Sequence, residues 1–349
     1  MKRILLVSAV ACTCLAPAAM AETAVKFGTN WVAQGEHGGF YQAVEDGSYK
    51  ACGLDVTIVP GGPQVNNRAM MLAGKIDFNM AGNLLSTFNA AAEGVPVVAV
   101  AASFQKEPQV FLTHPGKGKT FDDLKKLKIY VSDEGFASYY LWMKSAYGFT
   151  DEQREVYTFN MAPFIADENT AIQGYVSSEP LMVEKEAGWK PDALLLADAG
   201  YATYSTLIET MADTVATRPE VVQCFVDGSA KGWYNYLYGD SSKADARIKA
   251  DNPDITDEQL AFAREQLKAY GIVDSGDALE KGIGVMTKEH IDAFFKSMAD
   301  AGAIAPDLDY SSDPDHNRSV VTIIGSPEAV TEAAINMAKV DRKSTRLNS

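Results

Sequence analysis

Cysteine and histidine are scarce in this sequence. Its 349 residues contain four of each, and neither a CxxC pair nor a Cys/His spacing typical of metal ligands occurs. We therefore expect no structural zinc site, no other metal and no cofactor. Cys12 and Cys14 lie in an N-terminal apolar segment, which leaves Cys52 and Cys224 for the rest of the chain. In an exported protein these two could pair as a disulfide, or they could remain two separate buried thiols.

Long apolar runs are also few. The chain begins MKRILLVSAVACTCLAPAAMA, with two positive residues, a short apolar stretch and a small-residue A-x-A site. This pattern predicts a cleavable signal peptide over residues 1–21 and a periplasmic location, while an uncleaved anchor or a lipidated cysteine is the alternative. No later run approaches the roughly 18 apolar residues that a membrane-spanning helix needs. The polar end, residues 341–349 (DRKSTRLNS), predicts a non-native tail or else a disordered one.

Positive charge is underrepresented. The chain has 31 Lys and Arg against 46 Asp and Glu, which gives a formal net charge of −15. Such a surface repels nucleic acid and anionic lipid, so we expect neither as a partner. The balance does not exclude an anionic small molecule, because a few local N–H groups can bind one.

Strand-like and helix-like segments alternate along the chain. Apolar, β-branched stretches at 24–30, 54–62, 76–83 and 95–105 each precede a helical pattern, and a second series follows. In that second series we expect a helix over 165–174 and a strand over 175–180. The alternation predicts an α/β fold with two lobes and mostly parallel sheets. We expect residues 22–113 and 205–340 to form lobe 1 and the inserted residues 114–204 to form lobe 2, with a ligand cleft between them.

Polar and aromatic residues recur where these strands are expected to end. Amide and carboxylate groups there can read the edge of a small polar ring, and aromatic rings can stack on its faces. Many such residues are only turn formers or helix caps, and a loop tryptophan can simply cover a core. The candidate ligand-binding residues are Asn30, Trp31, His37, Tyr41, Asn83, Gly135, Asn160, Glu179 and Tyr201.

A longer motif adds a family resemblance. The stretch NWVAQGEHGGFYQA (30–43) resembles the N-W-x(5)-H-x-G-x-Y-x-A pattern of solute-binding proteins that serve ABC importers for thiamine pyrimidine precursors. The broader family includes sulfonate, taurine and nitrate binders and yeast-type enzymes that make the thiamine pyrimidine. The likeness covers roughly residues 24 to 240. It implies a two-lobed type II periplasmic-binding fold that closes on its ligand, acts with a membrane permease and functions as a monomer.

The resemblance also implies roles for individual residues. Asn30 and Trp31 would contact the heterocycle, His37 and Tyr41 would complete that wall, and Asn83 and Glu179 would hydrogen-bond the edge of the ring. Gly135 falls where the pyrimidine-making enzymes contact a phosphate, but here Ser132 and Asp133 make the segment acidic. That substitution favours an unphosphorylated or cationic ligand. Sulfonate, taurine or nitrate is the alternative.

Signals for catalysis are weak. The pyrimidine-making enzymes carry a cysteine cluster after their second lobe, whereas here Cys224 stands alone. No G-x-S-x-G nucleophile motif occurs, so HGGF (37–40) is better interpreted as a glycine-bearing loop that leads into a helix than as part of an oxyanion hole. We therefore predict a binding protein rather than an enzyme.

Overall fold

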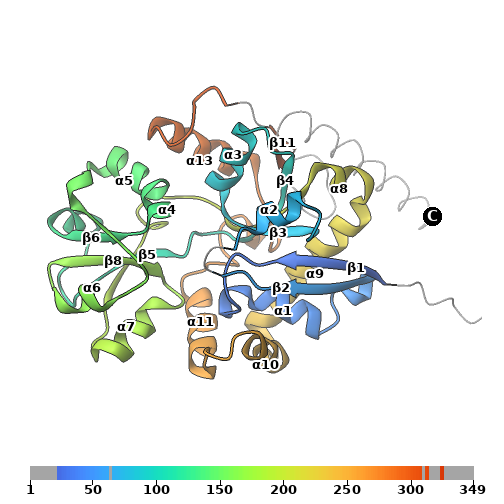
Figure 1. Cartoon of the computed structure of the whole chain (residues 1–349), viewed down its shortest axis with the longest axis horizontal. Helices are drawn as coiled ribbons and strands as arrows, with labels where there is room; N and C mark the ends of the chain where they lie inside the picture. Colours follow the sequence, from blue (N-terminus) through green and yellow to red (C-terminus); the bar gives the residue numbers. More distant parts are fainter. Residues whose placement is uncertain (1–21, 63–64, 309–310, 314–322, 326–349) are drawn as a thin grey trace, which may run out of the picture.

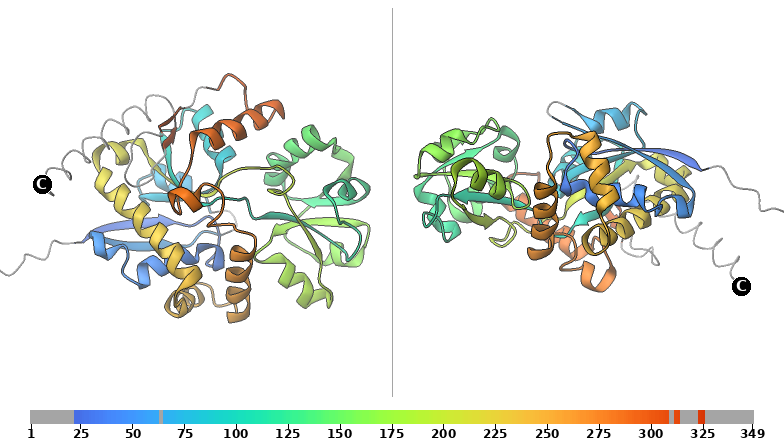
Figure 2. Two further views of the ribbon diagram at one scale, coloured as in Figure 1. Left: turned by 180° about the vertical axis from the view of Figure 1, so that it is seen from behind. Right: turned by 90° about the horizontal axis from the view of Figure 1, so that it is seen from below.

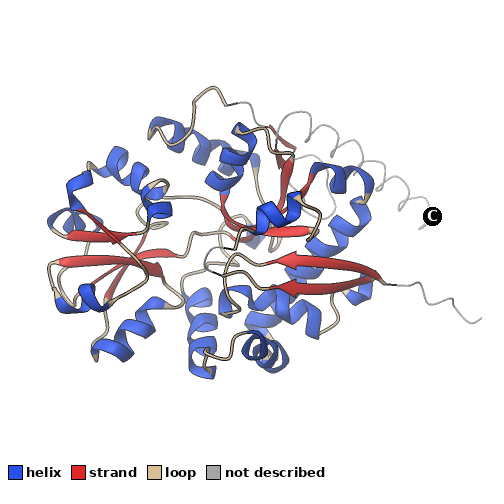
Figure 3. Cartoon of the chain, viewed as in Figure 1, coloured by secondary structure: helices blue, strands red, loops and turns tan. Residues whose placement is uncertain are grey.

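The computed structural model describes residues 22–62, 65–308, 311–313 and 323–325. The chain folds into two lobes that lie side by side along the long axis of the molecule (Figure 1). Each lobe contains one β-sheet with helices packed around it (Figure 3). The expected signal peptide (1–21) and tail (341–349) lie outside the described residues.

Lobe 1 is built on a seven-stranded sheet. Its strand order is β11-β12-β4-β10-β3-β1-β2. β1 pairs in parallel with β2 and β3, and β10 runs antiparallel between β3 and β4. The strands are β1 (Thr23–Gly28), β2 (Leu54–Val59), β3 (Phe78–Asn83), β4 (Val97–Phe104), β10 (Ser205–Met211), β11 (Ser311–Asp313) and β12 (Ile323–Gly325).

Lobe 2 is built on a five-stranded sheet in the order β7-β6-β8-β5-β9. β6 pairs in parallel with β7 and β8, and β5 runs antiparallel to β8 and β9. The strands are β5 (Gln109–Thr113), β6 (Lys128–Val131), β7 (Arg154–Val156), β8 (Thr170–Tyr175) and β9 (Asp192–Leu195).

The α/β class and the two-lobed fold are confirmed, but the sheets are mixed rather than mostly parallel. β12 runs antiparallel to β4 at one edge of the lobe 1 sheet. The other two strands that run against the parallel set, β5 and β10, are the ones that the chain forms directly after crossing from the other lobe. A strand that enters from the neighbouring lobe starts at the edge where the parallel strands end, so it must run the opposite way. Because β5 belongs to the smaller sheet, the first crossing lies at residues 105–108, earlier than expected.

Helices surround both sheets. α1 packs against α9 and α10 beneath the sheet of lobe 1, and the two further views show this layer clearly (Figure 2). The α-helices are α1 (Gly38–Glu45), α2 (Asn67–Leu72), α3 (Leu84–Ala92), α4 (Asp133–Phe136), α5 (Tyr139–Tyr147), α6 (Ala162–Ala166), α7 (Glu179–Ala187), α8 (Ala212–Thr217), α9 (Pro219–Tyr238), α10 (Ser242–Asp251), α11 (Asp257–Ala269), α12 (Ala278–Lys281) and α13 (Lys288–Asp300). The short 3₁₀ helices are η1 (Gly35–His37), η2 (Lys50–Cys52), η3 (Phe121–Lys126) and η4 (Asp151–Gln153).

One stretch of secondary structure was predicted wrongly. We expected a helix over 165–174 and a strand over 175–180, but α6 ends at Ala166, β8 occupies Thr170–Tyr175 and α7 begins at Glu179. The sequence of β8 is not rich in β-branched residues, so its strand conformation comes from its place between β6 and β5. Glu179 still follows a strand end, but as the first residue of a helix.

The paired glycines of the N-terminal motif have a packing role. A Cβ at Gly38 would lie 2.1 Å from the ring of Tyr236, and one at Gly39 would lie 2.2 Å from the ring of Trp233. α1 can therefore approach α9 only where side chains are absent. This explains the HGGF segment without any catalytic chemistry.

A disulfide joins Cys52 to Cys224 and so links η2 to α9. This settles the pairing that the sequence leaves open. Among the described residues, no helix combines the length and the apolar character needed to cross a membrane.

Candidate functional site

The parallel strands of the two lobes end facing one another, and two contacts join the lobes there. The rings of Trp31, after β1, and Phe159, after β7, have centroids 5.7 Å apart. Ser177, after β8, donates a hydrogen bond to the carboxylate of Glu36 in η1. These four residues define the facing walls of a candidate ligand site between the lobes.

Glu107 lies where the first crossing leaves lobe 1. Its side chain is 3% exposed, and Nδ2 of Asn83 donates to its Oε2 over 3.1 Å. Burial raises the pKa of Glu107 to about 7, against the opposing effects of hydrogen bonds from Asn83, Ser205 and the backbone of Gln109. Because Asn83 also caps α3 by accepting from the amide of Leu85, it links the end of β3 to the crossing.

Tyr201 lies in the second crossing, residues 196–204, which leads from β9 in lobe 2 back to β10 in lobe 1. It is fully buried, and its hydroxyl makes no hydrogen bond to the described residues. Burial, followed by the charge of Glu107, raises the pKa of Tyr201 well above its usual value, while the side chain of Asn83 opposes this shift, so the hydroxyl lies near both groups. Its ring packs against Tyr139 of lobe 2 and Phe294 of lobe 1, with centroids 6.3 Å and 5.4 Å away.

Gln173 organises the wall of lobe 2. Its Oε1 accepts from the backbone N–H of Ser132 at 2.7 Å and from the hydroxyl of Tyr139 at 2.8 Å. The amide of Gly135 donates to Ser132 Oγ, so this loop is closed by its own hydrogen bonds and has fewer donors left for a phosphate. A Cβ at Gly135 would collide with the Tyr139 hydroxyl at 2.3 Å, which gives this glycine a packing role.

Four carboxylates act electrostatically on Tyr175, the last residue of β8. Burial, and then the carboxylates of Glu107, Glu134, Glu36 and Glu179, raise its pKa well above the usual value. Glu179 accepts from the amide of Tyr175 at 2.7 Å, and burial raises its pKa too. Burial likewise raises the pKa of Glu36 to about 6, although the hydrogen bond from Ser177 opposes this shift. The site is therefore acidic on both lobes.

The start of the N-terminal motif shapes the wall of lobe 1. Asn30 is exposed, and its Oδ1 lies 3.2 Å from Nε2 of the fully buried His37. Burial lowers the pKa of His37 to about 3, so the imidazole is neutral and Nε2–H donates to Asn30. His37 thus orients Asn30 from beneath, and its own Nδ1 has no partner among the described residues.

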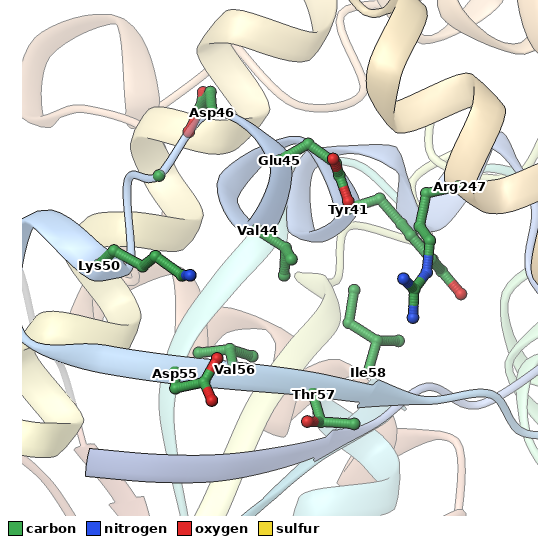
Figure 4. Close-up of a pocket in the computed structure, with 11 residues that line it drawn as sticks. Tyr41, Val44, Glu45, Asp46, Lys50, Asp55, Val56, Thr57, Ile58 and Arg247 are labelled. Atoms are coloured by element: carbon green, nitrogen blue, oxygen red, sulfur yellow. The ribbon is translucent and has the colours of Figure 1, made fainter. Parts of the chain in front are cut away.

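Tyr41 lies apart from the other candidates. Its hydroxyl donates to Asp251 in α10 at 2.9 Å, and the side chain lines a hollow of about 550 Å³ between α1, β2 and α10 (Figure 4). Tyr41 is four positions after His37, but His37 ends η1 and Tyr41 lies within α1, so the two side chains have different partners. Asn160 is exposed and accepts from the amide of Ala162, and its neighbour Phe159 is the one that reaches Trp31.

A smaller pocket of about 360 Å³ opens beside Asn30, along the second half of β3 and the starts of α2 and α3. Arg68 lines it, but both ends of its guanidinium fork bind Glu209, at 3.1 Å and 2.8 Å. Asn79 and Thr87 donate to the same carboxylate. The positive charge at this pocket is therefore already neutralised.

Several residues of the candidate site were not recognised from the sequence. Glu107 follows a buried strand and precedes Pro108, and this placement at a crossing was the available signal. Gln173 lies within a strand, and Glu36 and Ser177 acquire their roles only through contact between lobes, so no local pattern marks them. Among the described residues, no three His, Cys, Asp or Glu side chains are arranged to hold a metal ion.

The two lobes and the facing strand ends define the fold class, which comparison with solved structures supports. A Candida albicans protein described as having the generic periplasmic binding protein fold aligns with a TM-score of 0.54 and 17% identity, covering 81% of this chain and 91% of its own. The ligand-binding component of an ABC-type import system from Staphylococcus aureus, with zinc bound, aligns at 0.59 and 12%, covering 89% and 99%. The periplasmic nitrate-binding protein NrtA from Synechocystis aligns at 0.56 and 12%, covering 82% and 83%.

The sequence itself identifies the family. The model described as NMT1/THI5 like matches residues 34–242, more than half of the chain. The chain belongs to the NMT1/THI5-like family, which confirms the resemblance in its N-terminal motif. A model of the formiminotransferase N-terminal subdomain matches residues 286–348, many of which lie outside the described part of the chain. No curated protein matches the sequence.

Proposed function

We propose that this chain is the solute-binding component of an ABC importer and that it binds a small heteroaromatic nutrient between its lobes. Two observations support this proposal: Trp31 packs against Phe159 of the other lobe, and Asn83 and Tyr201 lie beside Glu107 at the crossings between lobes. An indole can stack on a flat ring while amide and carboxylate groups bind its edge. Our leading ligand is a thiamine pyrimidine precursor.

Lobe closure supplies the proposed mechanism. The Glu36–Ser177 hydrogen bond and the Trp31–Phe159 contact hold the walls together in this structure. On the rim, Lys185 of α7 and Glu258 of α11 form an exposed ion pair at 2.5 Å. Contacts of this kind form on closing and break on opening, so a ligand that touches both walls favours the closed state. A membrane permease would then recognise the closed pair of lobes.

The disulfide supports a periplasmic location. Disulfides persist in oxidising compartments and are rare in the cytosol. Together with the expected signal peptide, the Cys52–Cys224 bond is consistent with export before the protein folds. The proposal assigns no catalytic role to any residue.

A panel of ligands tests this proposal. We would measure the thermal unfolding of the mature chain with 4-amino-5-hydroxymethyl-2-methylpyrimidine, taurine, an alkanesulfonate and nitrate. A ligand at 100 times its dissociation constant adds about 2.7 kcal/mol of stability. Stabilisation by the pyrimidine alone supports the proposal. Stabilisation by the sulfonate or nitrate alone would show that the ligand is an anion and not a pyrimidine. Turnover of any compound would indicate an enzyme.

A further inference from the structure

Charged groups at the candidate site are paired unequally. Three basic side chains of the adjoining described segments have carboxylate partners: Arg68 binds Glu209, Lys106 binds Asp198 and Arg154 binds Asp133. By contrast, Glu36, Glu107 and Glu179 have no cation within salt-bridge distance in the described part of the chain. The site thus holds negative charge that the protein itself leaves without a counter-charge.

Among these carboxylates, Glu107 is the best placed to meet a ligand from both lobes. It lies at the crossing, with Asn83 of lobe 1 as its donor and with the rings of Tyr139 and Tyr201 in its neighbourhood. A buried carboxylate without a cation costs several kcal/mol and is retained where it has a function. Hydrogen bonds from Asn83, Ser205 and the backbone of Gln109 lower its pKa, but none of these donors is a cation.

The hydroxyl of Tyr201 gives independent support for a ligand at this point. It is a fully buried polar group without a hydrogen-bond partner in the described residues, and it lies close enough to Glu107 for that charge to act on it. Buried hydroxyls nearly always have a partner, so one without a well-aligned partner beside an uncompensated carboxylate is available to a polar ligand. A metal ion is a poor candidate for that ligand, because no three potential ligands are suitably arranged there among the described residues.

From these observations we infer that the interlobe site selects an organic cation, with Glu107 as its counter-charge and Tyr201 as a second polar contact. This inference rests on the proposed function and specifies the charge of the ligand. It distinguishes the chain from a binder of sulfonate or nitrate, whose anionic groups would face unpaired carboxylates here. A flat ring that carries an ammonium or amidinium group satisfies both the aromatic wall and the acidic floor.

Two series of compounds with a constant ring and variable charge test the inference. The first holds 4-amino-2-methylpyrimidines with 5-aminomethyl, 5-hydroxymethyl or 5-carboxylate groups, and the second holds benzamidine, benzamide and benzoate. We would measure dissociation constants by calorimetry on the wild-type mature chain. In at least one series the cation should bind about tenfold or more tightly than the neutral compound, and the anion should bind weakest.

Variants then locate the charge. Glu107→Gln keeps the shape of the side chain, and it should reduce the preference for the cation over the neutral compound by about tenfold. Glu134→Gln removes an exposed carboxylate of the same neighbourhood and should reduce that preference by less than about threefold, because solvent screens it. Far-UV circular dichroism and the melting temperature of each variant establish that it is folded.

The outcomes separate this inference from the proposed function. A neutral or anionic compound that binds best, or no binding in either series, overturns the selection of cations, and tight binding of the hydroxymethylpyrimidine would still support the proposed function. Binding of benzamidine without any pyrimidine supports the charge and contradicts the leading ligand. If the wild type prefers the cation and Glu107→Gln retains the preference, the assignment of Glu107 is wrong.

Discussion

Two buried glutamates of this protein have opposite surroundings. Glu209, in the sheet of lobe 1, is 0% exposed and is bound by Arg68, Asn79 and Thr87. Glu107, at the crossing between lobes, is 3% exposed and has the amide of Asn83 but no cation among the described residues. The first carboxylate has a full set of partners and therefore holds the fold together. The second lacks a counter-charge, and this difference distinguishes a structural acid from one available to a ligand.

The largest expected effect is on stability and concerns Glu209. Arg68→Ala leaves the Glu209 carboxylate buried without its cation and should cost about 3 kcal/mol of unfolding free energy in urea titrations. The matched control is Lys296→Ala, which breaks the exposed Lys296–Asp300 pair and should cost less than about 0.5 kcal/mol. Equal effects of the two substitutions would show that Glu209 is not stabilised by its pairing.

The next effect concerns the pH dependence of stability in the unliganded protein. The pKa of Glu107 is about 7 in the folded chain against 4.5 as its ordinary value, so the folded state binds the proton more tightly. The resulting stability is complete below about pH 4.5 and is lost as the pH rises through about 7. The free energy of unfolding of Glu107→Gln, relative to that of the wild type, should therefore rise by up to about 3 kcal/mol between pH 4.5 and pH 8.

The difference between the wild type and Glu107→Gln cancels the contributions of other titrating groups, because both proteins contain them. Glu36 has a raised pKa of about 6. His37 has a lowered pKa of about 3, so its contribution to stability rises between about pH 3 and 6.5, opposite to that of the two acids. The measurement is the difference between denaturation curves at each pH. A difference that does not change with pH would mean that Glu107 is no more protonated in the folded chain than in the unfolded one.

The third effect concerns affinity. Trp31→Ala should weaken binding of an aromatic ligand by about 1–3 kcal/mol, by analogy with the stacking of bases on aromatic side chains. Trp189→Ala is the control, because this partly buried tryptophan packs against His114 in lobe 2, with centroids 4.2 Å apart. Calorimetry should show a change for the first variant alone, and unchanged affinity in folded Trp31→Ala would place the indole outside the site.

The smallest effect separates the two tasks of Asn83. Asn83→Ala removes the cap of α3, which should cost about 1 kcal/mol at pH 5. At pH 8 the ionised Glu107 also loses its donor, so the loss should grow by about another 1 kcal/mol. Urea titrations at the two pH values measure both terms, and equal losses would show that Asn83 does not stabilise the charged carboxylate.

The sequence predicted the fold better than the site. Regular alternation of apolar strands and helices was enough for the α/β class. Trp31 does follow β1 and Asn83 does end β3, and their contact with a ligand stays a prediction. The direction of β5 and β10 was not predicted, since it depends on how the chain crosses between lobes rather than on local pattern.

Contacts that depend on three dimensions account for the remaining differences. Tyr41 belongs to the same motif as Trp31, but the turn of α1 directs it to Asp251. Glu107 is a single acidic residue in a short connection, and only its burial and its missing counter-charge give it significance. Pairing of Cys52 with Cys224 likewise needed the approach of η2 to α9.

The most direct test is a crystal structure of the mature chain with 4-amino-5-hydroxymethyl-2-methylpyrimidine or its 5-aminomethyl analogue. We expect electron density for the ring between the lobes, stacked on Trp31, with a polar group within hydrogen-bond distance of Glu107. Density in the hollow beside Tyr41, or at any place that Glu107 and Trp31 do not contact, would contradict the account.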